Sequence, residues 1–179
     1  MDIRERLKTL IGEKCVLKGD FTLASGARSS VYFDCKRVTL DPEGISLIGE
    51  QLWERIGELP VPVAAVGGPT IGADPIVGHL AALSWQKGKP MAAFLVRKDS
   101  KSHGKRRLIE NPPPAGTRVV LFEDVVTSGG STLDAIRAAE EAGLKVAAVF
   151  CLVDREQGGE KALSAYDYRP LFKKSEFGL

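Results

Sequence analysis

Hydrophobic residues follow two alternating patterns along most of the chain: short continuous apolar runs and longer segments with helical spacing. Continuous runs of this length are typical of strands buried on both faces, and they occur at Val63–Val66, Met91–Val96, Val119–Phe122 and Val146–Val153. Helical spacing separates them, from Ile76 to Leu83 and from about Ser131 to a stop at Gly143. Strands that alternate with helices predict an α/β fold, a doubly wound, mainly parallel sheet flanked by helices.

The first 60 residues have a different pattern, with two helices and short strands between them. Asp2 and Asp41-Pro42 are typical helix starts. The apolar positions that follow them form buried stripes, at Ile3, Leu7, Leu10 and Ile11 and at Ile45, Ile48, Leu52 and Ile56. The short strands are predicted at Val16–Leu17, Phe21–Leu23 and Val31–Phe33. At the other end of the chain, an edge strand is predicted in the aromatic tail, which holds Tyr166, Tyr168 and Phe172.

Composition narrows the class of protein. A chain of 179 residues with 44% hydrophobic residues fits one domain, residues 1–179, with a real core. The net charge of +2 is too small to indicate nucleic-acid binding. No apolar run approaches membrane-spanning length, the N-terminus does not begin a signal peptide, and Cys15, Cys35 and Cys151 are widely spaced. We therefore expect a cytoplasmic protein with reduced cysteines and no metal site built from them.

The segment from Val119 to Thr132 is the most informative about function. An apolar strand is followed by Glu123-Asp124, two valines and the turn Thr127-Ser128-Gly129-Gly130-Ser131-Thr132, which opens a helix. Such turns bind anions because glycines admit the ligand and the first helical N–H groups are unpaired. The carboxylates suit a ligand with hydroxyls beside its phosphate, as in ribose 5-phosphate. A Gly-Gly turn also has purely conformational uses, and acidic residues near a helix start can simply compensate its dipole.

The whole segment is more specific than its parts. It resembles the 5-phosphoribosyl-1-pyrophosphate (PRPP) signature of type I phosphoribosyltransferases, and it lacks the lysine of an ATPase or GTPase P-loop. In a parallel sheet, ligands bind beyond the carboxyl ends of the strands. Three segments are predicted there, Gly67–Thr70, Glu123–Thr132 and Asp154-Arg155, and one crevice would collect them.

A second feature is the basic run from Arg97 to Arg107, in which six of eleven residues are cationic and only Asp99 is acidic. A solvated surface loop or a nucleic-acid patch is the ordinary interpretation of such a run. Here the run contains no aromatic residue for base stacking, and a compact polyanion such as pyrophosphate is the better match. Its glycine and serines predict a mobile catalytic loop over residues 97–114.

Together these motifs resemble one family. Phe21–Gly26, Tyr32–Asp34, Arg97–Gly104, Glu123–Ser131 and Asp154-Arg155 occur in the order seen in the orotate phosphoribosyltransferases, over most of the chain. The resemblance implies transfer of phosphoribose from PRPP to orotate, giving orotidine 5-phosphate and pyrophosphate, in pyrimidine biosynthesis. It also implies Mg²⁺ carried on PRPP rather than in a protein cage, a base-covering hood formed by residues 1–40, and a homodimer in which the Arg97–Lys105 loop reaches the neighbouring active site.

The same resemblance assigns roles to individual residues of this chain. Pyrophosphate contacts fall to Arg97, Lys98, Lys101 and His103. Ribose-5-phosphate binding falls to Glu123, Asp124, Val125, Val126, Thr127, Ser128, Gly129, Gly130 and Ser131. Orotate binding falls to Tyr32, Phe33, Thr127 and Arg155, and the pyrophosphate loop, often with a non-proline cis peptide, to Gly67–Ile71. We take Lys101, His103 and Asp124 as the catalytic residues.

Two departures and two alternatives remain open at this point. Ala24 stands where the family often has a basic residue, a contact that Arg28 could replace, and Gly67–Ile71 contains no basic residue. Both bear on pyrophosphate affinity. The alternative functions are a purine phosphoribosyltransferase and a non-catalytic sensor of PRPP or nucleotides.

Overall fold

The computed structural model describes residues 2–22, 28–97 and 108–179. Within these residues, six strands form a central sheet in the order β5-β4-β3-β6-β7-β8. The strands are β3 (Ala65–Pro69), β4 (Ala92–Val96), β5 (Ile109–Glu110), β6 (Arg118–Val126), β7 (Lys145–Asp154) and β8 (Tyr168–Lys173). All neighbours pair in parallel except β4 and β5, which are antiparallel. The predicted mainly parallel α/β sheet is confirmed.

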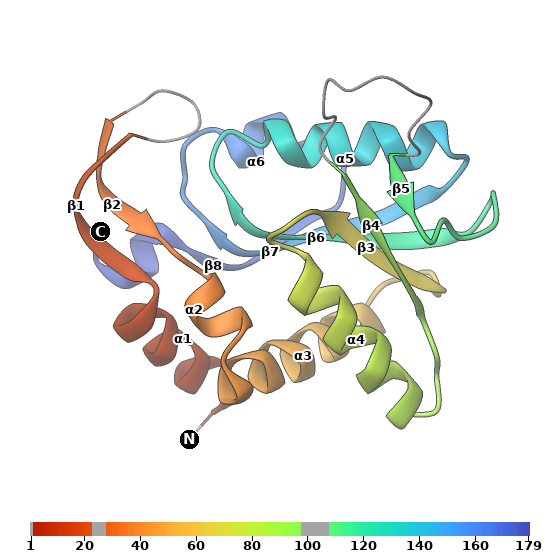
Figure 1. Ribbon diagram of the computed structural model, residues 1–179, viewed down its shortest axis with the longest axis horizontal. Helices are drawn as coiled ribbons and strands as arrows, with labels where there is room; N and C mark the ends of the chain where they lie inside the picture. Colours follow the sequence, from red (N-terminus) through yellow and green to blue (C-terminus); the bar gives the residue numbers. More distant parts are fainter. Residues whose placement is uncertain (1, 23–27, 98–107) are drawn as a thin grey trace.

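Helices cover both faces of this sheet, as a doubly wound fold requires (Figure 1). Helix α5 (Gly130–Glu141) and the short α6 (Gly159–Ala162) lie on one side. Helices α3 (Pro42–Gly57) and α4 (Asp74–Gln86) lie on the other. Strands β6 and β7 are therefore buried on both sides, and Phe122 and Phe150 stack with ring centroids 5.7 Å apart. Their continuous apolar sequences follow from this double burial.

The N-terminal residues form a separate two-stranded antiparallel sheet, β1 (Val16–Thr22) and β2 (Arg28–Phe33), beside the central one. It is flanked by α1 (Ile3–Lys14) and α2 (Lys36–Thr39). Near the C-terminus, the 3₁₀ helix η1 (Lys174–Phe177) packs Phe177 against Phe33, with ring centroids 5.7 Å apart. The Phe177 ring centroid also lies 5.9 Å from that of Phe172 in β8, so the C-terminal segment ties the small sheet to the central sheet. Figure 1 shows the C-terminus beside β1.

Local sequence accounts for the main helix boundaries. The Asp41 side chain accepts a hydrogen bond of 2.9 Å from the Gly44 backbone, and Pro42 opens α3 as predicted. Gly143 follows α5 with φ of 80°, in the left-handed region that ends helices. At α1 the expectation was only partly right, because Asp2 occupies the N-cap position but its side chain makes no capping hydrogen bond.

Several strand boundaries differ from the predicted ones. One strand with an irregular register, β1, replaces the two short strands expected at Val16–Leu17 and Phe21–Leu23. Strand β3 begins at Ala65 and includes Gly67-Gly68-Pro69, which were predicted to follow the strand. Strand β6 runs on to Val126, so Glu123 and Asp124 lie inside it rather than after it. The short β5 had no sequence signal, because its pairing partner β4 lies well before it in the chain. The predicted edge strand in the aromatic tail is confirmed as β8.

Candidate active site

The candidate site is a crevice of about 570 Å³ at the carboxyl ends of β3, β6 and β7. After β3 the chain crosses to β4 on one side, whereas β6 pairs with the other side of β3, so the crevice lies at the switch point of the sheet. Thr70–Gly72, the whole segment 123–132 and Arg155 line it together with Tyr32 and Phe33. The predicted convergence of three strand ends is confirmed, although Gly67 and Gly68 lie buried in β3 and only Thr70 and the residues after it reach the crevice.

The turn from Thr127 to Thr132 forms one wall of the crevice and leads directly into α5. Gly129 has φ of 83°, a left-handed conformation that favours glycine, and it turns the chain into the first residue of the helix. The first backbone N–H groups of α5 have no partners within the helix. The Oγ1 atom of Thr132 is buried without a hydrogen-bond partner among the described residues. This wall can therefore donate hydrogen bonds to an anion.

The two adjacent carboxylates serve different walls because consecutive residues of a strand point to opposite faces. Glu123 is buried and accepts a hydrogen bond of 3.0 Å from the Ser131 hydroxyl of α5. Asp124 lies against Gly72, where a Cβ atom would be 2.6 Å from the Asp124 carboxyl carbon. Burial raises the pKa of Asp124, and a hydrogen bond from the Val125 backbone and the charge of Lys36 oppose that rise. Both carboxylates can accept hydrogen bonds from a ligand's hydroxyls.

Arg155 lines the same crevice and ties the end of β7 to the N-terminal sheet. Its Nη2 atom donates to the Ser29 hydroxyl at 3.0 Å and to the Val31 carbonyl at 2.9 Å. Its side chain is buried, which lowers the pKa of the guanidinium, and its Nε atom has no partner among the described residues. Tyr32, which is 37% exposed, lines the same crevice. A fixed cation beside an aromatic ring suits a flat anionic ligand.

A buried network behind Arg155 was not anticipated from the sequence. The Tyr168 hydroxyl donates to Asp154 at 2.9 Å and lies 3.0 Å from the Cys151 sulfur. The other oxygen of Asp154 accepts the Glu156 backbone N–H at 2.7 Å. These contacts hold the turn on which Arg155 lies. The sequence predicted Tyr168 only as part of an edge strand. Its hydrogen bond with Asp154 forms only when β8 lies beside β7.

Lys36 is the second residue that sequence reasoning missed. It begins α2, lines the crevice and forms an ion pair of 3.1 Å with Asp34. Its position two residues after the Phe33-Asp34 pair was the available signal. Arg28, considered as a substitute for a basic residue at position 24, does not line the crevice. Position 24 itself lies outside the described residues.

Of the predicted basic loop, Lys98, Lys101 and His103 lie outside the described residues. Arg97 is described, and its guanidinium forms an ion pair of 2.9 Å with Glu110. It does not line the crevice of its own chain. The peptide bond between Thr70 and Ile71 is cis, as expected for the loop after β3.

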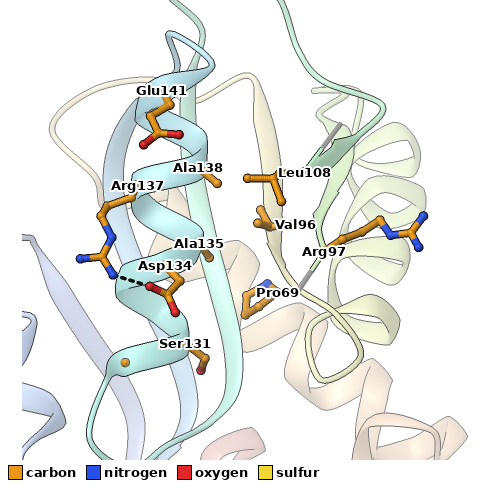
Figure 2. A pocket seen from close by; sticks show the side chains of 11 residues that line it. Pro69, Val96, Arg97, Leu108, Ser131, Asp134, Ala135, Arg137, Ala138 and Glu141 are labelled. Atoms are coloured by element: carbon orange, nitrogen blue, oxygen red, sulfur yellow. Dashed lines mark hydrogen bonds and ion pairs between the residues drawn. The ribbon is translucent and has the colours of Figure 1, made fainter. Parts of the chain in front are cut away.

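A larger hollow of about 710 Å³ adjoins the crevice at Gly130 and Ser131, between α5 and the β4–β5 edge (Figure 2). Most of its charged side chains already form ion pairs. Arg137 pairs with Asp134, and Arg97 points away from α5 (Figure 2) and pairs with Glu110. Its floor is apolar, with Val96 and Leu108 among its residues. Among the described residues, a carboxylate pair, a helix N-terminus and a buried arginine meet in the smaller crevice, which is therefore the candidate substrate site.

The described residues contain no group of three or more His, Cys, Asp or Glu side chains placed to hold a metal ion. The oxygens of Glu123 and Asp124 are nevertheless of the kind that Mg²⁺ prefers. None of the helices in the described ranges is long and apolar enough to cross a membrane.

Comparisons by sequence and by structure find the same kind of relatives. No protein-family model matches the chain. An orotate phosphoribosyltransferase of Bradyrhizobium sp. (strain ORS 278) is 42% identical over 97% of this chain and 96% of its own length. Orotate phosphoribosyltransferase of Mycobacterium tuberculosis H37Rv, crystallised with Fe(III) dicitrate, matches with a TM-score of 0.84 and 36% identity over 99% of this chain and 100% of that one. The same enzyme in complex with PRPP matches with a TM-score of 0.81 and 32% identity over 99% and 100%. By sequence over nearly its full length and by fold, the chain belongs to the orotate phosphoribosyltransferase family.

Proposed function

We propose that this protein transfers the phosphoribosyl group of PRPP to orotate, giving orotidine 5-phosphate and pyrophosphate, as a step of pyrimidine biosynthesis. The observation that carries the proposal is the meeting of three elements in one crevice: a carboxylate pair, a hydroxyl- and glycine-rich helix start, and a buried arginine. Membership of the orotate phosphoribosyltransferase family supports the same pair of substrates.

PRPP is held mainly by strand β6 and the turn after it. Thr127 to Ser131 bind the 5-phosphate through backbone N–H groups and hydroxyls at the start of α5. Glu123 and Asp124 accept hydrogen bonds from the ribose 2- and 3-hydroxyls, one carboxylate on each face of the strand. Val125 and Val126, between these groups, bring backbone against the sugar. The phosphate and the sugar are thus bound by consecutive residues of one segment.

Orotate lies between the N-terminal sheet and the end of β7, with Tyr32 and Phe33 framing its ring and residues 1–40 covering it as a hood. Arg155 binds the orotate anion. Two hydrogen bonds to β2 fix the orientation of its guanidinium, and the buried Nε–H remains available to a ligand. Thr127 contacts the base from the other side.

Departure of pyrophosphate leaves oxocarbenium character on the ribose, as in glycoside cleavage. The protein then contributes by aligning the two substrates and by stabilising charge on the departing pyrophosphate. We assign the second task to Lys101 and His103, with Arg97 and Lys98 assisting, from the loop of the neighbouring subunit. Asp124 orients the ribose. Orotate is already an anion, so its ring nitrogen needs little general-base help, and we assign no protein nucleophile.

Mg²⁺ bound to PRPP would supply neutralisation of charge on the pyrophosphate. The donors present fit that group, since the carboxylates of Asp124 and Glu123 would offer it oxygen ligands. The part of the chain that the structure describes holds no group of three such side chains, which fits an ion held mainly by PRPP. The reaction takes place in the cytoplasm, consistent with three free, buried cysteines.

The test is loss of orotate absorbance with purified protein, PRPP and Mg²⁺. We expect orotate-dependent release of pyrophosphate and no turnover of adenine, guanine or xanthine. Turnover of a purine instead of orotate would favour a purine transferase. Binding of PRPP with no turnover of any base would favour the sensor. Either result would refute the proposal.

The homodimer with shared loops has its own test. Lys101→Ala chains and Asp124→Asn chains are each expected to be inactive, because each lacks one half of every site. If the loop acts across the interface, mixing them regenerates one working site in each hybrid dimer. Absence of recovery after subunit exchange has been demonstrated would contradict loop sharing.

A further inference from the structure

We infer that Lys36 binds the pyrophosphate of PRPP from within the same subunit, a contact made by α2 rather than by the basic loop. The inference deepens the proposed function and rests on it. Lys36 begins α2, immediately after β2 and the Tyr32-Phe33 pair, and it lines the crevice. Among the described residues that line the crevice, Lys36 and Arg155 are the two basic ones, against the two carboxylates of Glu123 and Asp124.

Arg155, the other basic residue of the crevice, already forms hydrogen bonds with β2. Arg155 directs its Nη2 atom at Ser29 and Val31 and is almost completely buried on the base side of the crevice. The Lys36 side chain is 43% exposed, and its ion pair with Asp34 occupies one of the three N–H donors of the ammonium group. Lys36 therefore has both donors and room to bind a ligand in the crevice.

Lys36 and Asp124 line the same crevice, and each influences the titration of the other. Its pKa is raised first by the hydrogen bond with Asp34, and also by the charges of Tyr32 and Asp124. Lys36 in turn opposes the burial-raised pKa of Asp124. Asp124 lies against Gly72, at the end of the loop after β3. Lys36, Asp124 and Gly72 therefore border the same crevice, where a pyrophosphate group would meet all three.

Charge balance gives the physical reason for a cation here. Pyrophosphate carries several negative charges and must bind beside two carboxylates. Thr70–Gly72, which line the crevice after β3, carry no charge, and neither does the rest of the segment 67–72, Gly-Gly-Pro-Thr-Ile-Gly. A lysine close to Asp124 offsets this repulsion and offers charge-assisted hydrogen bonds to the phosphate oxygens.

The experiment compares Lys36→Met with Arg37→Met. Arg37 binds the same carboxylate, Asp34, at 3.3 Å, but its side chain is 54% exposed and does not line the crevice. Both variants lose one positive charge at neighbouring positions of α2, so their difference isolates the crevice contact. Lys36→Arg serves as the conservative variant that keeps the charge.

Three quantities are measured for each variant: the dissociation constant of magnesium pyrophosphate by calorimetry, the KM for PRPP and the KM for orotate. For Lys36→Met we expect pyrophosphate affinity to fall and the PRPP KM to rise about tenfold, the lower end for a charge-assisted contact because the site is partly solvated. We expect the orotate KM to stay within about twofold, Lys36→Arg to recover most of the loss, and Arg37→Met to match the wild type.

Three results would overturn the inference: unchanged pyrophosphate affinity in Lys36→Met, an equal loss in Arg37→Met, or a rise confined to the orotate KM. Failure of the proposed function gives a different pattern. If the wild type binds magnesium pyrophosphate and Lys36→Met does not, but orotate is never consumed, then Lys36 is a pyrophosphate ligand and the orotate reaction is what fails.

Discussion

Tyr168→Phe removes a single oxygen atom from the buried network behind Arg155. The lost hydroxyl donates to Asp154 at 2.9 Å, and Asp154 is only 1% exposed, so water cannot replace the bond without rearrangement. Hydrogen bonds to charged groups contribute roughly 1.5–3 kcal/mol. In the variant, Asp154 still accepts the hydrogen bond of 2.7 Å from the Glu156 backbone N–H, so its carboxylate keeps one donor. We therefore expect a loss of folding stability in the lower part of that range, about 2 kcal/mol. For a chain of this length, that corresponds to a fall in Tm of about 4–8 °C.

The same substitution is expected to weaken orotate binding. Asp154 holds the backbone of the turn that carries Arg155, so a looser turn raises the orotate KM while the PRPP KM changes little. The assays are urea unfolding with an unchanged m-value, thermal unfolding, and initial rates with each substrate varied in turn.

Tyr166→Phe is the matched control, since it deletes the same atom from a neighbouring tyrosine. The Tyr166 hydroxyl lies 3.5 Å from the exposed Glu140 carboxylate, so its loss should change stability by less than about 0.5 kcal/mol. Equal stability of the two variants would refute the role of the Tyr168 hydroxyl. A destabilised Tyr168→Phe with an unaltered orotate KM would refute its link to Arg155.

Three further expectations concern other residues of the site and core. Burial raises the pKa of Asp124, so the folded chain disfavours the ionised form and loses stability as the pH rises above the ordinary carboxyl pKa of about 3.9. Asp124→Asn should therefore raise Tm at neutral pH in Mg²⁺-free buffer while activity is lost, with no gain below that pH; an equal Tm at neutral pH would contradict this. Gly72→Ala places a Cβ atom against the Asp124 carboxylate and should raise the PRPP KM at least tenfold, and a normal KM would show that the two walls can separate. The Cys35 thiol has its pKa raised by a hydrogen bond with Cys15 and by burial, and burial likewise raises the pKa of Cys151. All three thiols should react slowly with a disulfide reagent in the native protein and quickly in urea, and fast native labelling would contradict their burial.

Sequence reasoning succeeded where structure depends on neighbours along the chain. The apolar runs of β6 and β7 are continuous because both faces are covered, and that requirement is visible in the residues themselves. Asp41-Pro42 predicted the start of α3 because capping involves residues three positions apart. The PRPP segment was found for the same reason, since its phosphate turn and carboxylates are contiguous.

Reasoning from local pattern failed where a residue's role depends on a distant partner. Glu123 and Asp124 were placed after the strand, but β6 continues through them because β7 pairs alongside as far as Asp154. Lys36 was missed although it follows the Phe33-Asp34 pair, because only the tertiary structure brings it into one crevice with the end of β6. Tyr168 and Asp154 are 14 residues apart and meet only across β7 and β8.

The sequence by itself determined the fold class, the order of the main strands and helices along the chain, and the chemical character of the segments proposed to bind phosphate and ribose. These follow from periodicity and turn chemistry, which act over a few residues. The tertiary structure alone decided the strand order β4-β3-β6-β7 that gathers the segments into one crevice, the side of β6 on which each carboxylate lies, and the approach of Lys36 and Arg155. Those choices depend on which surfaces bury one another across the whole molecule.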